Sequence, residues 1–194
     1  MKERRWLVVL IPAAALAIFF GISPLALLLS LMVCHVLHSG ALALGLVFAG
    51  GGAAGVVVSL LVARLARSPK RVAVLWSVYA AGGAAIALVS LVPNVWGLGV
   101  VTAIEVGLIL YGDVLWVATM QELVPGEILG RVSSLVYLFA FSLGPLGILA
   151  GGGAGAALGT KTALVVSGIV SGAICLLVLV IPGVRDPERD PATR

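Results

Sequence analysis

Charged side chains are scarce in this sequence. They make up 10% of its 194 residues, whereas soluble domains carry roughly 25%. Hydrophobic residues account for 61%, and the mean hydropathy is +1.22. A surface with so little charge is typical of a protein that lies in lipid, and the sequence leaves no room for a soluble domain.

Sequence patterns for catalysis and for metal binding are also missing. The motifs H-E-x-x-H, G-x-S-x-G and G-x-x-x-x-G-K-[ST] do not occur, so an intramembrane enzyme would have neither a nucleophile nor a metal set. We therefore predict no enzyme activity and no cofactor. Cys34, His35 and His38 cluster at the end of the first apolar stretch, where they could share a metal, but without a carboxylate the set is weak. We interpret them as interfacial polar residues, and Cys175 as an apolar filler.

Six long apolar stretches are present, and each is long enough to cross a bilayer, which takes about 20 residues. The sequence therefore predicts an all-α, polytopic transmembrane domain over residues 1–181, followed by a disordered tail over 182–194. The first stretch follows a basic start but is too long for the apolar region of a signal peptide, so we expect a permanent span. The predicted spans are Trp6–Val33, Ala41–Ala63, Val72–Val92, Val95–Met120, Val132–Ala156 and Lys161–Ile181.

The basic residues predict how these spans are oriented. With six spans, eleven of the 12 Lys and Arg residues fall on one side of the membrane, and only Lys161 falls on the other. Because Lys and Arg accumulate in cytoplasmic loops, both termini should be cytoplasmic, in the inner or plasma membrane. The net charge of +4 sits at membrane edges, which argues against nucleic-acid binding. The eleven are Lys2, Arg4, Arg5, Arg64, Arg67, Lys70, Arg71, Arg131, Arg185, Arg189 and Arg194.

Two acidic residues, Glu105 and Asp113, lie inside the fourth apolar stretch. An ionised side chain near the centre of a bilayer costs roughly 2.5–3.5 kcal/mol on insertion scales, so such residues usually face a cavity or pair within the bundle. At 3.6 residues per turn, Thr102, Glu105, Gly112 and Asp113 form one polar flank, with the two acids about 12 Å apart along the helix axis. This flank predicts a site for protons or for a cationic substrate; the alternative is acids that are hydrogen-bonded within the bundle.

Glycines mark several of the predicted spans. Gly168 and Gly172 have the G-x-x-x-G spacing in the sixth span. Small residues of this kind let helix backbones approach closely in lipid. In the fifth span, Gly144 and Pro145 are candidates for a hinge, because proline interrupts the helical hydrogen bonds. Close packing is the simpler interpretation of the other glycines.

The segment between the fourth and fifth spans carries a polar motif, with Glu122, Pro125, Glu127, Gly130 and Arg131. Glu127 precedes Arg131 by four residues, which is the favourable orientation for a helical ion pair. Such a pair at a membrane edge could latch neighbouring helices. The alternative is a solvated surface pair, worth about a few tenths of a kcal/mol.

Residues 115–125 and 130–134, with Leu115-Trp116, Q-E-L-V-P at 121–125 and G-R-V-S-S at 130–134, resemble a segment of the major facilitator superfamily. The similar branch is the drug- and siderophore-efflux one, which includes macrolide-efflux and enterobactin-exporter proteins. The loop at 63–71 departs from the family motif G-x-x-x-D-x-x-G-R-R, because Ala63 and Arg67 replace Gly and Asp. Asp113 stands where members of that family often have Asn.

This resemblance implies a specific role for the chain. The six helices would form the C-terminal half of the family fold, and the protein would be half of a proton-coupled antiporter that exports small amphiphilic molecules. A substrate cavity between two six-helix halves requires a partner, either a second half or another copy of this chain. The alternative is a truncated or non-transporting membrane module that pairs with, or regulates, a full-length transporter.

Overall fold

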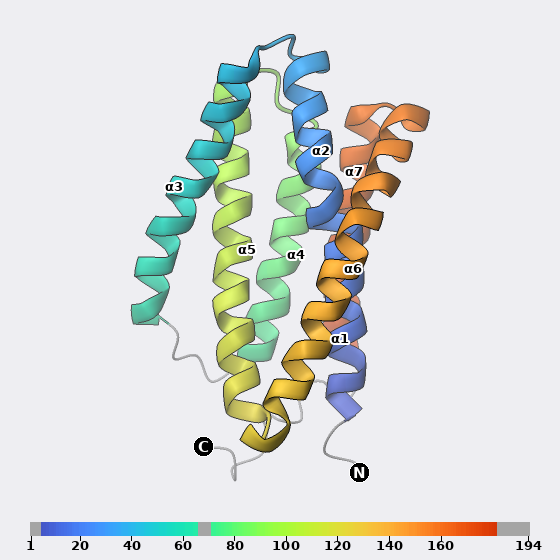
Figure 1. Ribbon diagram of the computed structural model, residues 1–194. Coiled ribbons are helices and arrows are strands. Elements are labelled where there is room, and N and C mark those ends of the chain that lie inside the picture. The colour runs from blue at the N-terminus through green and yellow to red at the C-terminus, as the bar shows by residue number, and fades with distance from the viewer. Residues whose placement is uncertain (1–4, 66–70, 182–194) are drawn as a thin grey trace.

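The chain folds into a bundle of long helices (Figure 1). The computed structural model describes residues 5–65 and 71–181, and within these ranges it contains helices and no strand. Six helical segments are long and apolar enough to cross a membrane. The predicted all-α, polytopic fold is confirmed, and the protein is a multi-span membrane protein.

The first span is built from four consecutive helical elements, and each of the other spans is one helix. The elements are α1 (Arg5–Ala17), η2 (Ile18–Ile22), α2 (Ser23–Leu31) and η3 (Met32–Val36) in the first span, then α3 (Ala41–Leu65), α4 (Arg71–Val89), α5 (Val95–Leu123), α6 (Gly126–Leu158) and α7 (Thr160–Val180).

Most boundaries lie within a few residues of those predicted, but α6 begins at Gly126 instead of Val132. Pro125 is its N-cap residue, and the Pro125 carbonyl accepts hydrogen bonds from the backbone N–H groups of Ile128 and Leu129 at 3.0 Å. Glu127 lies in the first turn, where a negative charge is favourable to the helix dipole. The expected loop is therefore helical on both sides of a short turn.

The connections at the opposite end of the bundle are short turns as well. Asn94 caps α5, and its Oδ1 atom accepts a hydrogen bond from the Gly97 backbone N–H at 2.8 Å. Between α6 and α7, Gly159 has a φ of 84°, a conformation that favours glycine. Both connections are therefore made by one or a few residues.

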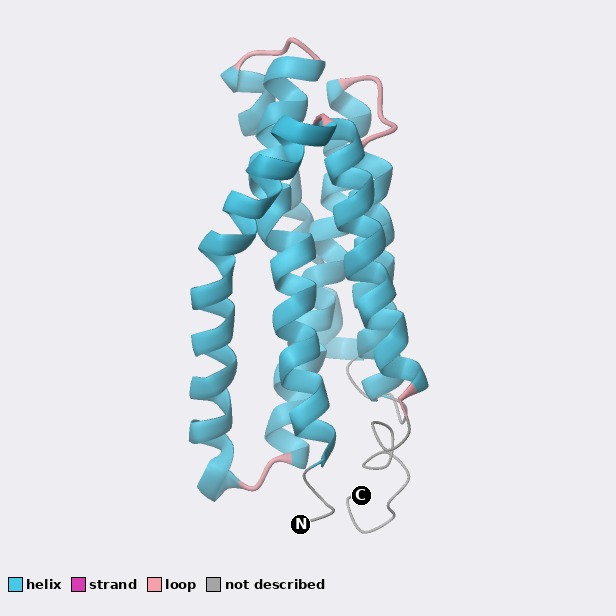
Figure 2. Cartoon of the chain, turned by 90° about the vertical axis from the view of Figure 1, so that its right-hand side faces the viewer, coloured by secondary structure: helices cyan, strands magenta, loops and turns pink. Residues whose placement is uncertain are grey.

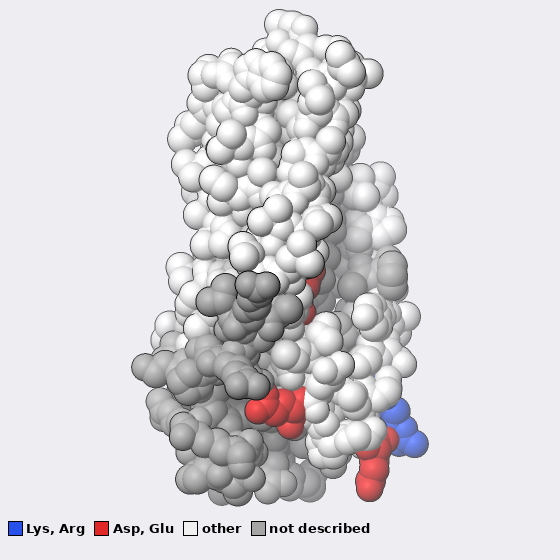
Figure 3. Space-filling model, turned by 90° about the vertical axis from the view of Figure 1, so that its left-hand side faces the viewer, with Lys and Arg blue, Asp and Glu red and all other residues white. Residues whose placement is uncertain are grey.

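Because successive spans run in opposite directions, α1 begins and α7 ends at the same end of the bundle, the lower end in Figure 1. Arg64, Arg71 and Arg131 belong to helix ends on this side, and Lys161 lies at the other end. The charged side chains on the face in Figure 3 gather mainly toward the lower end. Residues 66–70 of the loop at 63–71 and the tail at 182–194 lie outside the described residues.

Buried side chains form two clusters, one in each half of the bundle. Trp76, Leu115 and Cys175 belong to the cluster nearer the chain ends, and Met32 and Leu164 belong to the other. The helices pack side by side in the order α3, α5, α4 and α7, while α6 packs against the first span. As a result, α6 has little contact with α5 beyond the turn that joins them (Figure 1).

Glycine brings α4 and α7 into backbone contact. A Cβ atom on Gly83 of α4 would lie 2.7 Å from the Gly172 backbone nitrogen and 2.8 Å from the Gly168 carbonyl oxygen. Such distances leave no space for a side chain. The close-packing interpretation of Gly168 and Gly172 is confirmed, and their partner is Gly83.

The first span is interrupted near its middle by the π-helical segment η2. Pro24 has no N–H to donate to the Phe20 carbonyl four residues earlier. Instead, the Ser167 hydroxyl of α7 donates to this carbonyl, and the Ser171 hydroxyl donates to the Ala17 carbonyl at 3.2 Å. Two serine hydroxyls of α7 therefore bond backbone carbonyls beside the point where Pro24 cannot donate.

The helix α6 is continuous through Pro145, and it bends about halfway along its length (Figure 2). Gly144 meets only the Ser23 hydroxyl oxygen, at 4.0 Å from an ideal Cβ. Gly147, one turn further on, lies against the first span, with the Phe19 carbonyl oxygen 2.6 Å from its ideal Cβ. A hinge at Gly144 and Pro145 stays a prediction.

Candidate functional site

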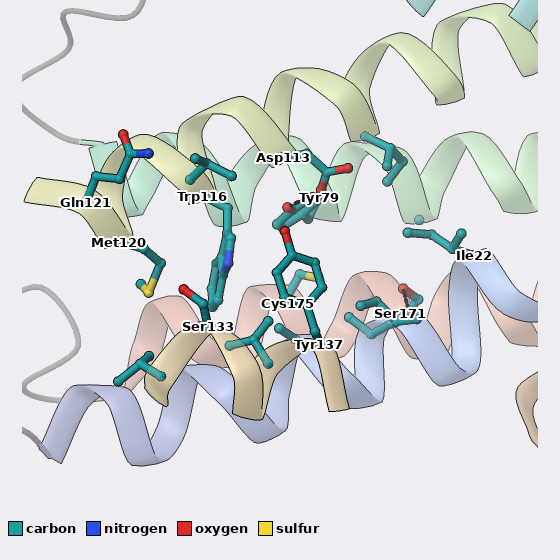
Figure 4. A pocket seen from close by; sticks show the side chains of 18 of the residues that line it. Ile22, Tyr79, Asp113, Trp116, Met120, Gln121, Ser133, Tyr137, Ser171 and Cys175 are labelled. Atoms are coloured by element: carbon teal, nitrogen blue, oxygen red, sulfur yellow. Dashed lines mark hydrogen bonds between the residues drawn. The ribbon is translucent and has the colours of Figure 1, made fainter. Parts of the chain in front are cut away.

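A cavity of about 560 Å³ opens between the first span and helices α4 to α7, in the half of the bundle nearer the chain ends. Its walls are mainly apolar and aromatic. Pockets for small molecules commonly have volumes of about 300–1,000 Å³ and a few placed polar groups. The polar and aromatic residues among the described lining are Tyr79, Asp113, Trp116, Gln121, Ser133, Tyr137, Ser171 and Cys175 (Figure 4).

Asp113 is the one charged residue in the described lining of this cavity. Its side chain is exposed, although it lies within a membrane span. The Tyr79 hydroxyl of α4 donates a hydrogen bond to Asp113 Oδ1 at 2.7 Å. Figure 3 shows acidic atoms in a hollow partway up the molecule, well above the charged lower end. Asp113 itself lines the cavity, which suits an acid inside a membrane span.

The position of Tyr79 depends on a glycine of the facing helix. A Cβ atom on Gly112 would lie 2.8 Å from Tyr79 Cδ1 and 2.9 Å from its Cζ, so the ring lies directly against α5. Because Asp113 is the next residue of α5, the phenol reaches it from the same contact. Sequence analysis included Gly112 in the polar flank but missed Tyr79, because only packing reveals which α5 residue a tyrosine of α4 faces.

Aromatic rings continue the cavity wall on both sides of Asp113. Trp76 is fully buried and makes edge-to-face contacts with Tyr79, at 6.0 Å between centroids, and with Trp116, at 6.5 Å. It therefore braces two rings of the wall. Tyr137 extends into the cavity from α6, on the side opposite Tyr79 and Asp113 (Figure 4). Neither Trp76 nor Tyr137 was singled out from the sequence.

Thr102 and Glu105 do not belong to this cavity. Each is only 3% exposed, which corrects the expectation that Thr102, Glu105 and Asp113 present one polar flank. A Cβ atom on Gly51 of α3 would lie 3.7 Å from Thr102 Cγ2, so Thr102 is covered by α3. On α5, Thr102 and Glu105 therefore face the inside of the bundle. Of the three polar residues, only Asp113 faces the cavity.

Both buried residues lack polar partners within the described chain. Thr102 Oγ1 is buried without a hydrogen bond, and Glu105 makes no side-chain hydrogen bond there. The choice between a proton site and an acid hydrogen-bonded inside the bundle therefore stays a prediction for Glu105. A buried carboxyl group without a partner is costly when ionised, which keeps Glu105 a candidate for proton handling.

The loop motif lies beside the lower part of the cavity. Glu122 lies in the last turn of α5, and Pro125 caps α6. Glu127, Gly130 and Arg131 belong to the first turns of α6, and the side chains of Glu127 and Arg131 are exposed. The neighbouring residues Gln121 and Leu129 line the cavity. The motif therefore shapes the turn that joins two cavity walls, and a latching role stays a prediction.

No group of three or more His, Cys, Asp or Glu side chains among the described residues is placed to hold a metal ion. Cys34, His35 and His38, at the end of the first span, do not form such a group either. Cys175 is buried against the cavity and Cys34 is exposed near the opposite end. The described lining therefore offers one carboxylate bonded to a phenol, further aromatic rings and a few neutral polar groups.

Comparisons with known protein families, curated proteins and solved structures give no significant match. The resemblance described above rests on the residues of the α5–α6 segment. In chemical terms the cavity can hold a small molecule with an apolar body, and Asp113 gives it one point of charge.

Proposed function

We propose that this chain is one six-helix half of a proton-coupled efflux carrier for small amphiphilic molecules, as the resemblance of its α5–α6 segment to the major facilitator superfamily implies. The observation that carries the proposal is the cavity around Asp113. Its mainly apolar walls suit an amphiphile, and it is open on one side, as a substrate site between two halves must be.

The need for a second half follows from the exposure of Asp113. A carboxylate inside a membrane span faces a water-filled cavity or a partner, because lipid does not stabilise its charge. On the α6 side of the cavity, Tyr137 and Leu138 are 59% and 61% exposed. A second six-helix unit, from another chain or from a copy of this one, would close the cavity there.

The same proposal assigns the orientation. The excess of Lys and Arg at the end where α1 begins makes this end cytoplasmic in the inner or plasma membrane. The cavity lies in this half of the bundle, so it would be the inward-open side of the carrier. The substrate would enter from the cytoplasm, and alternating access would require the two halves to rock against each other.

The proton step is assigned to Glu105. It lies in the same helix as Asp113, eight residues earlier, and its carboxyl group is buried without a described partner. A change in its charge would alter the stability of the α5 packing, and this is how proton binding could bias the two states of a carrier.

The test is transport by the purified chain in liposomes with an imposed pH gradient. Fluorescent amphiphilic dyes report export, and liposomes without protein and without a gradient are the controls. We expect gradient-dependent export that the Glu105→Gln variant loses and that the Asp113→Asn variant keeps in part, because Asn is common at this position in the resembled family. An assembled protein that binds the dyes but never moves them would contradict the proposal and favour the non-transporting module.

A further inference from the structure

We propose that the cavity is selective for organic monocations, with the positive charge beside Asp113 and an apolar or aromatic body between Trp116 and Tyr137. This inference rests on the proposed function insofar as the cavity is the carrier's substrate site. It goes further because it names the charge of the ligand and the residues that recognise this charge.

The charge of the lining is the first argument. The described lining contains one carboxylate and no Lys, Arg or His. A cavity of this kind attracts a single positive charge, and its low-dielectric walls strengthen the attraction. An anion of the same size would meet uncompensated negative charge, so the cavity should exclude it.

The hydrogen bond from Tyr79 is the second argument. It occupies Asp113 Oδ1 and fixes the carboxylate, while the described residues donate no hydrogen bond to Oδ2. One oxygen is therefore held by the protein, and the other is open to a ligand. A fixed acceptor loses less conformational freedom on binding than a mobile one.

The aromatic rings are the third argument. Trp116 and Tyr137 reach the cavity from α5 and α6 on either side of the space next to Asp113 (Figure 4). The faces of such rings attract cations within about 6 Å of the ring centroid. Because Trp76 contacts Trp116 from the core, one of these two rings is held in place before a ligand arrives.

The experiment compares three probes of one shape and different charge. They are tetraphenylphosphonium, tetraphenylsilane and tetraphenylborate, which are cationic, neutral and anionic. Binding to the purified chain in mild detergent is measured by equilibrium dialysis at one salt concentration, and partition into protein-free micelles is subtracted. We expect the cation to bind at least about tenfold more tightly than the other two, as a charge-assisted contact implies.

Variants show whether the preference comes from this cavity. In Asp113→Asn the cation should bind about tenfold more weakly and lose its advantage over the neutral probe. Glu127→Gln, which removes an exposed acid outside the cavity lining, is the matched control and should bind like the original chain. Trp116→Leu should weaken cation binding, whereas Trp96→Leu should not, because Trp96 is 78% exposed at the far end of α5.

The comparison of the three probes on the unaltered chain tests the charge preference even if a variant fails to fold. Equal affinity for the cation and the anion would overturn the inference, and so would a folded Asp113→Asn protein that keeps the full preference. Cation-selective binding without gradient-driven transport would contradict only the proposed function. Transport with no preference for charge would contradict only the inference about selectivity.

Discussion

Two carboxyl groups of α5, eight residues apart in the sequence, have opposite surroundings. Glu105 is 3% exposed and lacks a described hydrogen-bond partner, whereas Asp113 is exposed to a cavity and accepts a hydrogen bond from Tyr79. A buried group without a partner changes the energy of the fold when its charge changes, while an exposed one is available to a ligand. We therefore assign the proton to Glu105 and the substrate to Asp113.

The Glu105→Gln variant tests the first of these assignments. Glutamine keeps the size of the side chain but cannot release a proton, so proton-driven export should be abolished, while Glu105→Asp should keep part of it. Export is measured in liposomes with a pH gradient, and the amount of inserted protein is measured in the same membranes. Undiminished proton-driven export by a normally inserted Glu105→Gln protein would remove the proton role.

The Gly112→Ala variant tests how the site is held together. The added Cβ would lie 2.8 Å from Tyr79 Cδ1, so the ring must move, which we expect to cost about 1–3 kcal/mol of stability and to break the hydrogen bond to Asp113. Thermal unfolding in detergent measures the loss. Gly99→Ala is the matched control in the same helix, because nothing lies within 4 Å of the added atom. Equal melting temperatures for both variants would contradict the packing described.

At the scale of helices, the first span is the element most dependent on its neighbours. Pro24 leaves the Phe20 carbonyl without its helical donor, and the Ser167 hydroxyl of α7 replaces it. On the next turn, Ser171 bonds the Ala17 carbonyl. Ser167 and Ser171 of α7 thus face the first span and bond its backbone carbonyls. Gly168 and Gly172 face α4 and allow close backbone packing there.

The Ser167→Ala variant should destabilise the bundle, because it leaves a backbone carbonyl in an apolar environment without a donor. We expect a loss of about 1–2 kcal/mol, in the range for an unsatisfied buried group. Ser59→Ala is the control, since the Ser59 hydroxyl bonds only the Gly55 carbonyl of its own helix. Unfolding by a denaturing detergent compares the two. A loss no larger than in the control would show that α7 does not support the break.

The sequence was sufficient to predict the spans, because twenty consecutive apolar residues have few other interpretations. It missed the start of α6, since two charged residues and two glycines interrupt the apolar pattern over residues 126–131 although the backbone there is helical. The site was predicted less completely. Asp113 was identified from its charge, but the rings of Tyr79 and Tyr137 were not, and Glu105 was grouped with a cavity from which it is separated. Which face of an apolar helix points inward depends on the packing of all six.

At the scale of the whole molecule, the bundle has one charged end and one nearly uncharged end. The helix ends with Arg64, Arg71 and Arg131 lie together, and Lys161 lies at the other end. The cavity opens in the half nearer the basic end. Orientation in the membrane therefore determines from which side the cavity can be reached.

Reporter fusions measure this orientation. Fusions after Arg71, Arg131 and Arg194 should report the cytoplasm, and fusions near Ser39 or Thr160 should report the exterior, because basic residues resist translocation. The five fusions are compared at equal expression. A cytoplasmic signal at Ser39 or Thr160 would be incompatible with six spans in this orientation.

In the function proposed above, this chain transports only as half of a larger assembly. The most direct measurement is the protein mass, from light scattering corrected for detergent, of the species that exports dye after reconstitution. We predict an active species with at least two six-helix units and a silent monomer of 19.7 kDa. A stable monomer that drives proton-linked export by itself would contradict the claim.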